Sequence, residues 1–257
     1  MSIDLEVIDH IAVITMNRPE KLNALDADAY GELSAAWIRV RDDDDVRVAV
    51  VTGAGNRSFS VGADMKSFVT NQRSLDQFWK TQQHVLLNRG LDMWKPVVAA
   101  VNGYCLGGGM TLLLATDIRV AVAEATFGLP EVKRGILPGN GGTQRILSQL
   151  PYAIAMEMLL TGEPFGANTA LRWGLINRVT DGADLMDVAF EYAEKLAANA
   201  PLAVQGAKEA ALRSREMNLA SGLRMEQALN RLLYFTEDAN EGPAAFAERR
   251  EPEYFGR

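Results

Sequence analysis

The sequence has few of the residues on which metal sites, disulfide frameworks and His-activated nucleophiles depend. Its 257 residues include one cysteine and two histidines. The single Cys105 excludes an internal disulfide framework, suits a reducing compartment and is expected to be a small buried packing residue. His10 and His84 stand in no metal-ligand spacing, so neither a metal site nor a His-activated nucleophile is expected. We expect His10 in a turn and His84 on a helix surface.

Targeting signals and long apolar runs are also scarce. The N-terminal MSIDLEVID is too acidic for a signal or transit peptide, which favours a cytoplasmic location. One segment, 96–118, is long and apolar enough to suggest a membrane span. Asn102 and the glycines 107–109 interrupt it, and its first part is β-branched, so it is predicted to be a buried strand followed by a buried helix. The net charge of −7 argues against general binding to nucleic acid or anionic membranes.

Apolar periodicity predicts strands that alternate with helices, followed by a helical end of the chain, which is an α/β organisation. Predicted strands are a hairpin of Leu5–Ile8 with Ile11–Met16, and then Val46–Thr52, Val97–Val101 and Ile118–Val122. Predicted helices are one that Asp26 caps and that runs to about Arg39, then Leu75–Met93, Ala183–Asn199, Leu202–Arg213 and most of Leu219–Phe246.

The glycine-rich stretch NGYCLGGGM lies between a predicted strand and a predicted helix. Backbone N–H groups at the start of a helix have no intrahelical partner and carry the positive end of the helix dipole. Bare glycines allow another molecule to approach these groups, which suits a phosphate or a developing oxyanion. Tight packing of the helix against the strand explains the glycines equally well, and the motif alone does not decide between the two.

Two further glycine-containing stretches, taken alone, have ordinary explanations. TGAGNRSFSVGADMK begins like a dinucleotide-binding loop, but Ser58 stands where the third glycine belongs and no helix opens there. What remains is consistent with a tight turn. GLPEVKRGILPGNGGTQR places Glu131 among several turns. An isolated glutamate is usually a solvated surface residue.

As a set, these stretches resemble one family. The segments NRPEKLNAL, SVGADMK, NGYCLGGGM, LPEVKRGILPGNGGTQR and RWGLINRV resemble those of the crotonase family, the enoyl-CoA hydratases and isomerases. RWGLINRV and the EDANEGPAAFAERR tail also resemble the carnitinyl-CoA dehydratases of that family. The resemblance implies a spiral of repeated ββα units over residues 1–198. It further implies a helical region, 199–257, that builds homotrimers or dimers of trimers and completes the CoA site.

The resemblance also implies the substrate and the catalytic residues. The substrate is an acyl-CoA thioester, so CoA enters as part of the substrate and no separate cofactor is expected. Ala63 and Gly108 match the two backbone N–H donors to the thioester oxygen, Glu131 matches one catalytic glutamate, and Gly139 matches a donor to the catalytic water. Thr111 stands where two-glutamate hydratases have their second glutamate. Threonine cannot act as a base near pH 7, although it can hold a water or a hydroxyl.

This threonine leaves the reaction open. Isomerase-type chemistry with Glu131 as sole proton shuttle is slightly favoured over two-glutamate hydration. The alternatives are a hydratase or hydroxyacyl-CoA dehydratase that uses one glutamate, and a low-turnover acyl-CoA-binding or RNA-binding scaffold of the same fold. The acidic net charge disfavours RNA.

By the same resemblance, eight residues are expected to contact CoA. Two sit near the chain's end and would reach CoA in a neighbouring subunit, with arginine at 249 where lysine is common. For each lysine, a solvated surface charge is the alternative. The expected contacts are Lys21, Leu22, Ala24, Asp64, Met65 and Lys66 in one subunit and Phe246 and Arg249 from its neighbour.

Overall fold

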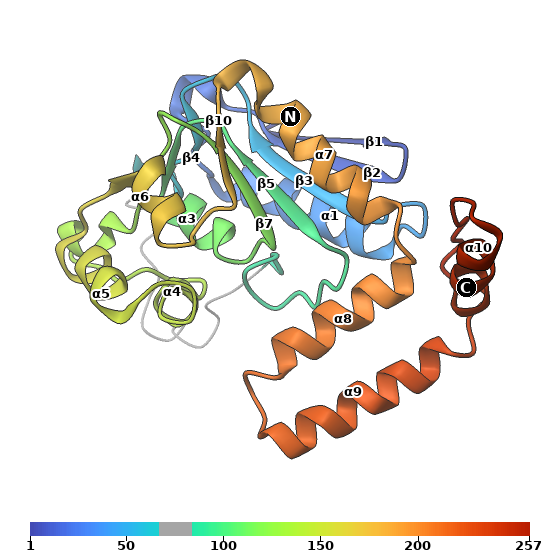
Figure 1. Cartoon of the computed structure of the whole chain (residues 1–257). Helices are drawn as coiled ribbons and strands as arrows, with labels where there is room; N and C mark the ends of the chain where they lie inside the picture. Colours follow the sequence, from blue (N-terminus) through green and yellow to red (C-terminus); the bar gives the residue numbers. More distant parts are fainter. Residues whose placement is uncertain (67–83) are drawn as a thin grey trace.

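The computed structural model describes residues 1–66 and 84–257. In these residues a six-stranded and a four-stranded β-sheet are surrounded by helices (Figure 1). The larger sheet has the spatial order β1 (Ile3–Ile8), β2 (Ile11–Met16), β3 (Val48–Gly53), β5 (Val97–Val101), β7 (Ile118–Val122) and β10 (Arg178–Thr180). The smaller sheet has the order β4 (Ser58–Ser60), β6 (Tyr104–Leu106), β8 (Thr126–Gly128) and β9 (Phe165–Gly166).

From β3 to β8, consecutive strands alternate between the two sheets. β3, β5 and β7 are parallel neighbours in the larger sheet, and β4, β6 and β8 are parallel neighbours in the smaller one. Each turn of the chain therefore adds one strand to each sheet before the next begins. In the second turn, the pair β5 and β6 leads directly into the short helix α3 (Gly108–Leu113). This is the repeated ββα winding that the family resemblance implied.

Helices cover the larger sheet because its central strands are apolar on both faces. Every residue of β3 and of β5 is buried, as expected for parallel strands between two layers. Helix α7 (Leu185–Ala197) packs across β3, β5 and β7 (Figure 1). Helix α1 (Ala27–Asp42), which the side chain of Asp26 caps as predicted, packs against β1 and buries Trp37 and Val40 completely.

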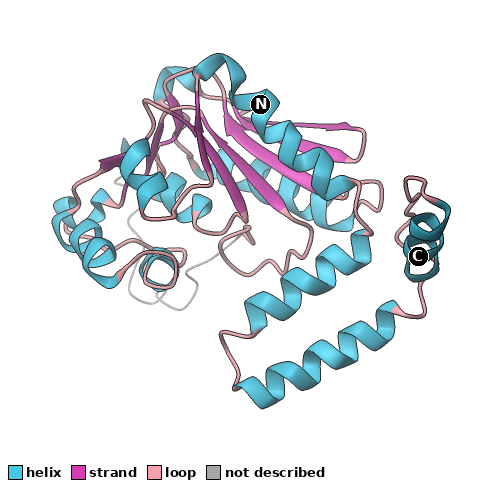
Figure 2. Ribbon diagram, in the orientation of Figure 1, coloured by secondary structure: helices cyan, strands magenta, loops and turns pink. Residues whose placement is uncertain are grey.

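Most of the remaining helices lie between β8 and β10 and at the end of the chain. Between β8 and β10 they are the 3₁₀ helix η3 (Pro130–Arg134), α4 (Gly142–Ile146), α5 (Tyr152–Thr161) and α6 (Ala167–Arg172). Two further 3₁₀ turns are η1 (Pro19–Lys21) and η4 (Gly182–Asp184). The chain ends with α8 (Pro201–Arg213), α9 (Leu219–Leu233) and α10 (Asp238–Glu248), which stand apart from the strands (Figure 2). No helix of the described residues is long and apolar enough to cross a bilayer.

Most elements predicted from the sequence are confirmed, including the hairpin, the three buried strands and the helical end of the chain. His10 lies in the hairpin turn with φ +68°, and Cys105 is buried, both as predicted.

The helix predicted over Leu75–Met93 is wrong for its described part. Residues 84–93 form bends and turns, with Leu86 bridged to Arg89 and Gly90. The earlier residues of the prediction lie outside the described residues. The apolar side chains of this segment anchor a loop on the core instead of forming one helical stripe. His84 therefore sits at a bend and is half-buried, not on a helix surface.

Candidate active site

Two loops meet where the family resemblance placed a pair of backbone donors. Gly108 is the first residue of α3, so its N–H has no carbonyl one turn earlier to bond. Ala63 forms a parallel bridge with Leu25, but the residues on either side of Ala63 make its hydrogen bonds, at 2.8 and 2.9 Å. The Ala63 N–H therefore points to the opposite side, toward α3. A Cβ placed on Gly108 would lie 3.5 Å from Ala63 N, so both N–H groups can reach one oxygen.

The three glycines before and within α3 are required by backbone shape and by space. Gly107 has φ +53°, a conformation that side chains with a Cβ rarely adopt. A Cβ on Gly108 would lie 3.2 Å from the Tyr30 hydroxyl, on the side where a ligand would sit. A Cβ on Gly109 would collide with the Ser60 carbonyl oxygen. Both explanations from the sequence therefore apply: Gly109 is a packing glycine, whereas Gly108 borders the site.

Glu131 lies beside the same turn. It is in the first turn of η3, and a Cβ placed on Gly107 would be 3.3 Å from its Oε1. Its Oε2 is buried and has no hydrogen-bond partner among the described residues. Burial raises the pKa of the Glu131 carboxyl above its usual range, and its backbone hydrogen bond and Arg134 only partly oppose this. A raised pKa suits a group that takes up and returns a proton near neutral pH.

Thr111 occupies the next part of the site, one turn into α3. Its side chain is 1% exposed, and its Oγ1 donates to Gly108 O at 3.0 Å. The same Oγ1 accepts from Asn88 Nδ2 at 3.1 Å. The position that holds a second carboxylate in two-glutamate hydratases therefore holds a neutral hydroxyl–amide pair. Glu131 lacks a carboxylate neighbour at this position.

A tyrosine lies near Glu131, and an arginine lies against that tyrosine. Burial raises the pKa of the Tyr30 hydroxyl, the charge of Arg89 lowers it, and the charge of Glu131 raises it. Tyr30 is thus close to both charged groups. The Arg89 guanidinium lies over the Tyr30 ring, 5.8 Å from its centroid, and Nη1 donates to Asn140 Oδ1 at 2.9 Å. The site has a cation as well as a carboxylate.

The loop that carries Gly139 closes on Thr111. Gly142 N donates to Gly139 O at 3.1 Å, and a Cβ on Gly142 would lie 2.9 Å from Thr111 Cγ2. Gly139 itself is exposed, with no atom within 4 Å of where its Cβ would be. The loop is therefore adjacent to the site. Donation by Gly139 to a catalytic water stays a prediction.

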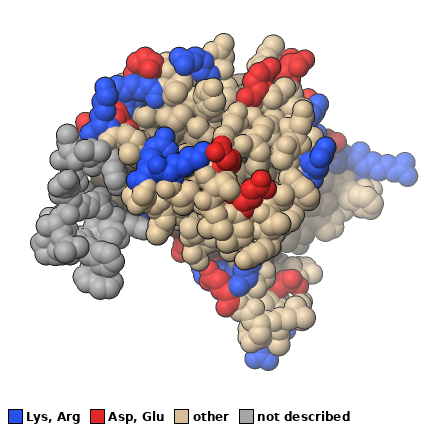
Figure 3. Space-filling model, turned by 90° about the vertical axis from the view of Figure 1, so that its left-hand side faces the viewer, with Lys and Arg blue, Asp and Glu red and all other residues tan. Residues whose placement is uncertain are grey.

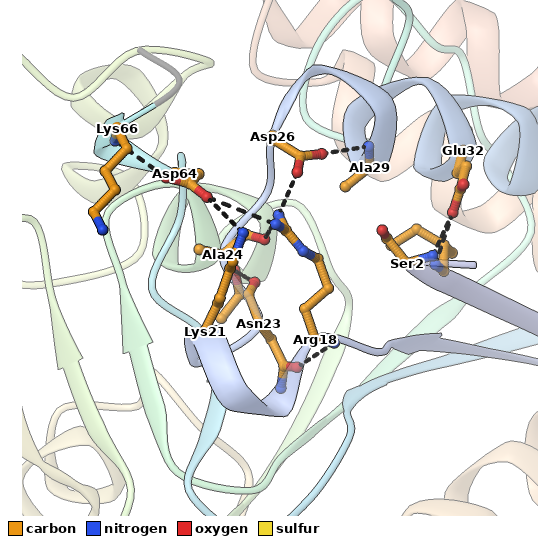
Figure 4. A network of polar contacts seen from close by, with 12 residues as sticks. Ser2, Arg18, Lys21, Asn23, Ala24, Asp26, Ala29, Glu32, Asp64 and Lys66 are labelled. Carbon is orange, nitrogen blue, oxygen red and sulfur yellow. Dashed lines mark hydrogen bonds and ion pairs between the residues drawn. The ribbon is translucent and has the colours of Figure 1, made fainter. Parts of the chain in front are cut away.

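The two loops expected to contact CoA are joined by ion pairs and hydrogen bonds (Figure 4). Arg18 donates to Ala24 O at 2.8 Å and pairs with Asp26 at 2.8 Å. Both Arg18 and Lys21 also lie 3.7 Å from Asp64 Oδ2. One arginine thus connects the loop of residues 21–24 to the loop of residues 64–66, and the two form one surface next to Ala63.

The other residues of this surface that are expected to contact CoA are Leu22, Met65 and Lys66. Leu22 has φ +55° and ends η1, Met65 is exposed, and Lys66 N donates to Asp64 Oδ1 at 3.1 Å. Their contact with CoA stays a prediction.

Phe246 and Arg249 do not join this surface within one chain. Phe246 belongs to α10 and Arg249 is its C-cap, and α10 lies beyond α8 and α9, away from α3 (Figure 1). Phe246 is 87% exposed. In this position neither residue can contact the CoA surface of its own chain. The predicted contact with CoA in a neighbouring subunit stays a prediction.

Sequence reasoning missed Arg18, Tyr30, Asn88 and Arg89. Arg18 is the second residue of NRPEKLNAL, but this motif does not by itself indicate the ion pairs that Arg18 makes. Tyr30 lies one helical turn after the capping residue Asp26, and nothing in the sequence around it indicates a functional role. Asn88 and Arg89 lie in the segment predicted to be a helix. An amide and a guanidinium on a predicted surface helix give no reason to suspect a buried site.

The fold brings two backbone N–H groups next to a buried carboxylate, an arrangement suited to binding a carbonyl oxygen and moving a proton. In the described residues, no group of three His, Cys, Asp or Glu side chains could hold a metal ion. The chain belongs to the enoyl-CoA hydratase/isomerase family, whose model matches residues 6–257. It is therefore an enzyme of CoA thioesters, as the motifs predicted.

Relatives and solved structures span the whole chain. The chain is 45% identical over 256 residues to the (E)-benzylidenesuccinyl-CoA hydratase of Thauera aromatica, covering 100% of both proteins. It is 41% identical over 261 residues to the carnitinyl-CoA dehydratase of Proteus mirabilis, covering 100% of this chain and 99% of the relative. The crystal structure of an enoyl-CoA hydratase from Bacillus anthracis superimposes with a TM-score of 0.91 at 34% identity, covering 100% of both chains. These matches confirm the crotonase fold.

Proposed function

We propose that the protein adds water across the C2=C3 double bond of a 2-enoyl-CoA thioester, and removes it in reverse, with Glu131 as the single acid–base carboxylate. The observation that carries this proposal is the buried Glu131 Oε2, which has no hydrogen-bond partner among the described residues, beside the Ala63 and Gly108 donors. Relatives named as a hydratase and as a dehydratase, each similar over the full chain, support addition and elimination of water.

The proposed steps balance with one carboxylate. Glu131 removes a proton from water as the water oxygen bonds to C3, and the C2=C3 electron pair moves toward the thioester carbonyl. Charge then collects on the thioester oxygen, where the Ala63 and Gly108 N–H groups stabilise it most in the transition state. Loss of one such donor typically costs about 3–4 kcal/mol. Protonated Glu131 finally returns its proton to C2, which restores the thioester and the base.

A shift of the double bond from C3=C4 to C2=C3 is the second candidate, and Thr111 favours it. Isomerisation needs one proton moved from one carbon to another, which a single carboxylate can do without holding water. The sequence slightly favoured this reaction. The names of the relatives now favour addition or elimination of water, so isomerisation becomes the alternative to be measured.

We further propose that the acyl group carries an anionic substituent. Arg89 brings a positive charge to the wall beside Tyr30, and Thr111 removes one negative charge that a second glutamate would supply. A benzylidenesuccinyl thioester, the substrate in the name of the Thauera relative, has one free carboxylate and an aromatic ring in addition to the thioester. A cation near the acyl group favours such a carboxylate over a neutral alkyl chain.

A scaffold with little turnover has less support. Its acyl-CoA-binding form would not need a carboxylate with a raised pKa beside the donors. Its RNA-binding form would need a continuous basic surface. On the face drawn in Figure 3, the acidic and basic side chains of the described residues are intermixed with uncharged ones.

We also propose that the protein assembles as a homotrimer or a dimer of trimers, in which α10 completes the CoA site of a neighbour. The large exposed apolar side chains of α9, α10 and the turn between them support association.

The decisive experiment is a substrate panel. Purified protein would be incubated with crotonyl-CoA, a 3-enoyl-CoA of matched length and (E)-benzylidenesuccinyl-CoA, with products identified by mass spectrometry in heavy water. Hydrated product, formed faster with the carboxylate-bearing thioester, is expected. Isomerisation without hydration would select the second candidate, and no turnover of any thioester would select the scaffold.

A further inference from the structure

Two buried oxygen atoms without partners border the start of α3. One is Glu131 Oε2 and the other is Asn88 Oδ1, and neither has a hydrogen-bond donor among the described residues. Asn88 is 5% exposed. Buried acceptors are costly unless a donor reaches them, so each unpartnered acceptor needs an explanation.

The position of the Asn88 amide is fixed by its neighbours. Thr111 Oγ1 has one proton, which it donates to Gly108 O at 3.0 Å, so toward Asn88 it can only accept. Asn88 must therefore present its NH₂ group to Thr111 and its Oδ1 elsewhere. The Asn88 backbone is held as well, because Arg145 Nη1 donates to its carbonyl oxygen at 3.0 Å.

Both acceptors are tied to one short segment of backbone. Glu131 lies against Gly107, and Thr111 N donates to Gly107 O at 2.9 Å. Through Thr111, Asn88 is fixed to the next residue, Gly108. A water molecule has two O–H donors, and two acceptors around one glycine turn can each receive one of them.

We infer that Asn88 is a positioning residue, and that the reacting water is held between Glu131 Oε2 and Asn88 Oδ1. This rests on the proposed hydration reaction. Asn88 accepts one O–H bond and keeps that proton on the oxygen, while Glu131 removes the other proton as the oxygen bonds to C3. In reverse, Asn88 accepts from the 3-hydroxyl, and Glu131 first removes the C2 proton and then protonates the leaving hydroxyl. The hydroxyl–amide pair thus does the orienting work of a second carboxylate without its charge.

Asn102 provides a matched comparison. Its Oδ1 is also buried and has no partner among the described residues, but its Nδ2 donates at 2.7 Å to Gly53 O at the end of β3 and at 2.7 Å to Gly55 O in the loop that follows. Asn102, which follows β5, therefore holds the end of β3 and the loop after it. Asn88 is instead bonded to Thr111 of α3, beside the proposed donors. Truncation of either asparagine removes buried hydrogen bonds, but only Asn88 should affect the reacting water.

The test compares Asn88→Ala with Asn102→Ala. Hydration would be measured with crotonyl-CoA or (E)-benzylidenesuccinyl-CoA, whichever wild type turns over faster. Calorimetric affinity for butyryl-CoA and exchange of its C2 protons in heavy water provide readouts that need no reacting water. For Asn88→Ala we expect kcat for hydration to fall on the order of 30-fold or more, with affinity and exchange within about threefold. Asn102→Ala should leave the ratio of hydration to exchange unchanged.

Asn88→Asp tests the same idea if the alanine variant does not fold. It keeps an acceptor in place but adds a negative charge next to the shared water, which should raise the pKa of Glu131 and move the acid limb of the hydration profile to higher pH. Unchanged hydration in Asn88→Ala, an equal loss of hydration and exchange, or an unmoved acid limb in Asn88→Asp would overturn the inference. If wild type hydrates no thioester, the proposed function fails and the inference with it. If wild type hydrates and only these variants disagree, the inference alone fails.

Discussion

The strand-containing core and the C-terminal region both contain long helices, but the two regions differ in how far these helices are buried. Helix α7 buries five of its residues against the larger sheet, whereas α8 and α9 have no buried residue. Apolar side chains near the end of the chain remain in solvent, including Leu219 at 77%, Phe235 at 89% and Phe246 at 87% exposure. The core buries most of its large apolar side chains within one chain, although Leu137, Tyr152 and Leu160 stay exposed, whereas α8 and α9 contain no buried residue.

This difference shows what an apolar stripe on a helix predicts. The stripe predicts that one face of the helix will be covered, but not whether the same chain or another copy covers it. Exposed apolar patches of this kind mark contact surfaces. If the division is real, changes in the core should alter function at every protein concentration. Changes in the C-terminal helices should act through assembly and depend on concentration.

The largest effect is expected from Glu131→Gln, the clearest core change. The amide cannot take up the proton, so turnover should fall on the order of 100-fold or more at all protein concentrations, while affinity for butyryl-CoA is retained. Steady-state kinetics and calorimetry on the folded variant measure both. A folded variant with near-wild-type turnover would remove Glu131 from the mechanism.

Gly108→Val should have the next largest effect, because any Cβ there enters the space beside Tyr30 and the donor pair. Affinity for acyl-CoA should weaken by about tenfold or more, again at every protein concentration. Gly182→Val is the control, since nothing lies within 4 Å of a Cβ at that exposed turn. Equal affinities in calorimetry for the two variants would contradict the placement of the donor pair.

Phe235→Asp tests the other half of the comparison. A charge on this exposed aromatic position between α9 and α10 should weaken the proposed assembly, so light scattering should show smaller species. Activity should fall several-fold at low protein concentration and recover at high concentration. Ile8→Asp, at the end of β1 on the core, is the matched control. An active wild-type monomer, or a Phe235→Asp variant with unchanged mass, would refute assembly through this region.

The smallest effect concerns the stability of the core. Because burial raises the folded-state pKa of Glu131, the native protein binds more protons than the unfolded chain between the ordinary carboxyl pKa and the raised one. Stability therefore falls as pH rises through that window. Glu131→Gln lacks this loss, so its Tm should exceed that of wild type by about 1–2 °C near pH 8 and match it near pH 4. Parallel Tm profiles for the two proteins would show that Glu131 is not destabilised by burial.

Much of the fold could be predicted because apolar periodicity and caps are local signals. Val97–Val101 and Ile118–Val122 have the predicted bounds, and Asp26 caps α1 as expected. The segment 84–93 could not be predicted, because its apolar side chains anchor a loop through contacts with distant residues. For the site, the family motifs pointed to Ala63, Gly108 and Glu131. They do not include Tyr30, Asn88 or Arg89, which lie in other segments of the chain.

The sequence by itself determined the class of enzyme, the order of strands and helices, and the absence of a second glutamate at Thr111. These depend on residue identity and spacing along the chain. Only the tertiary structure decided that Asn88 bonds Thr111, that Tyr30 lies near both Arg89 and Glu131, and that Arg18 joins the two loops expected to contact CoA. Each of these pairs is distant in sequence or lies on a segment whose backbone follows no regular period. Their proximity depends on how the ββα turns stack, which no local pattern encodes.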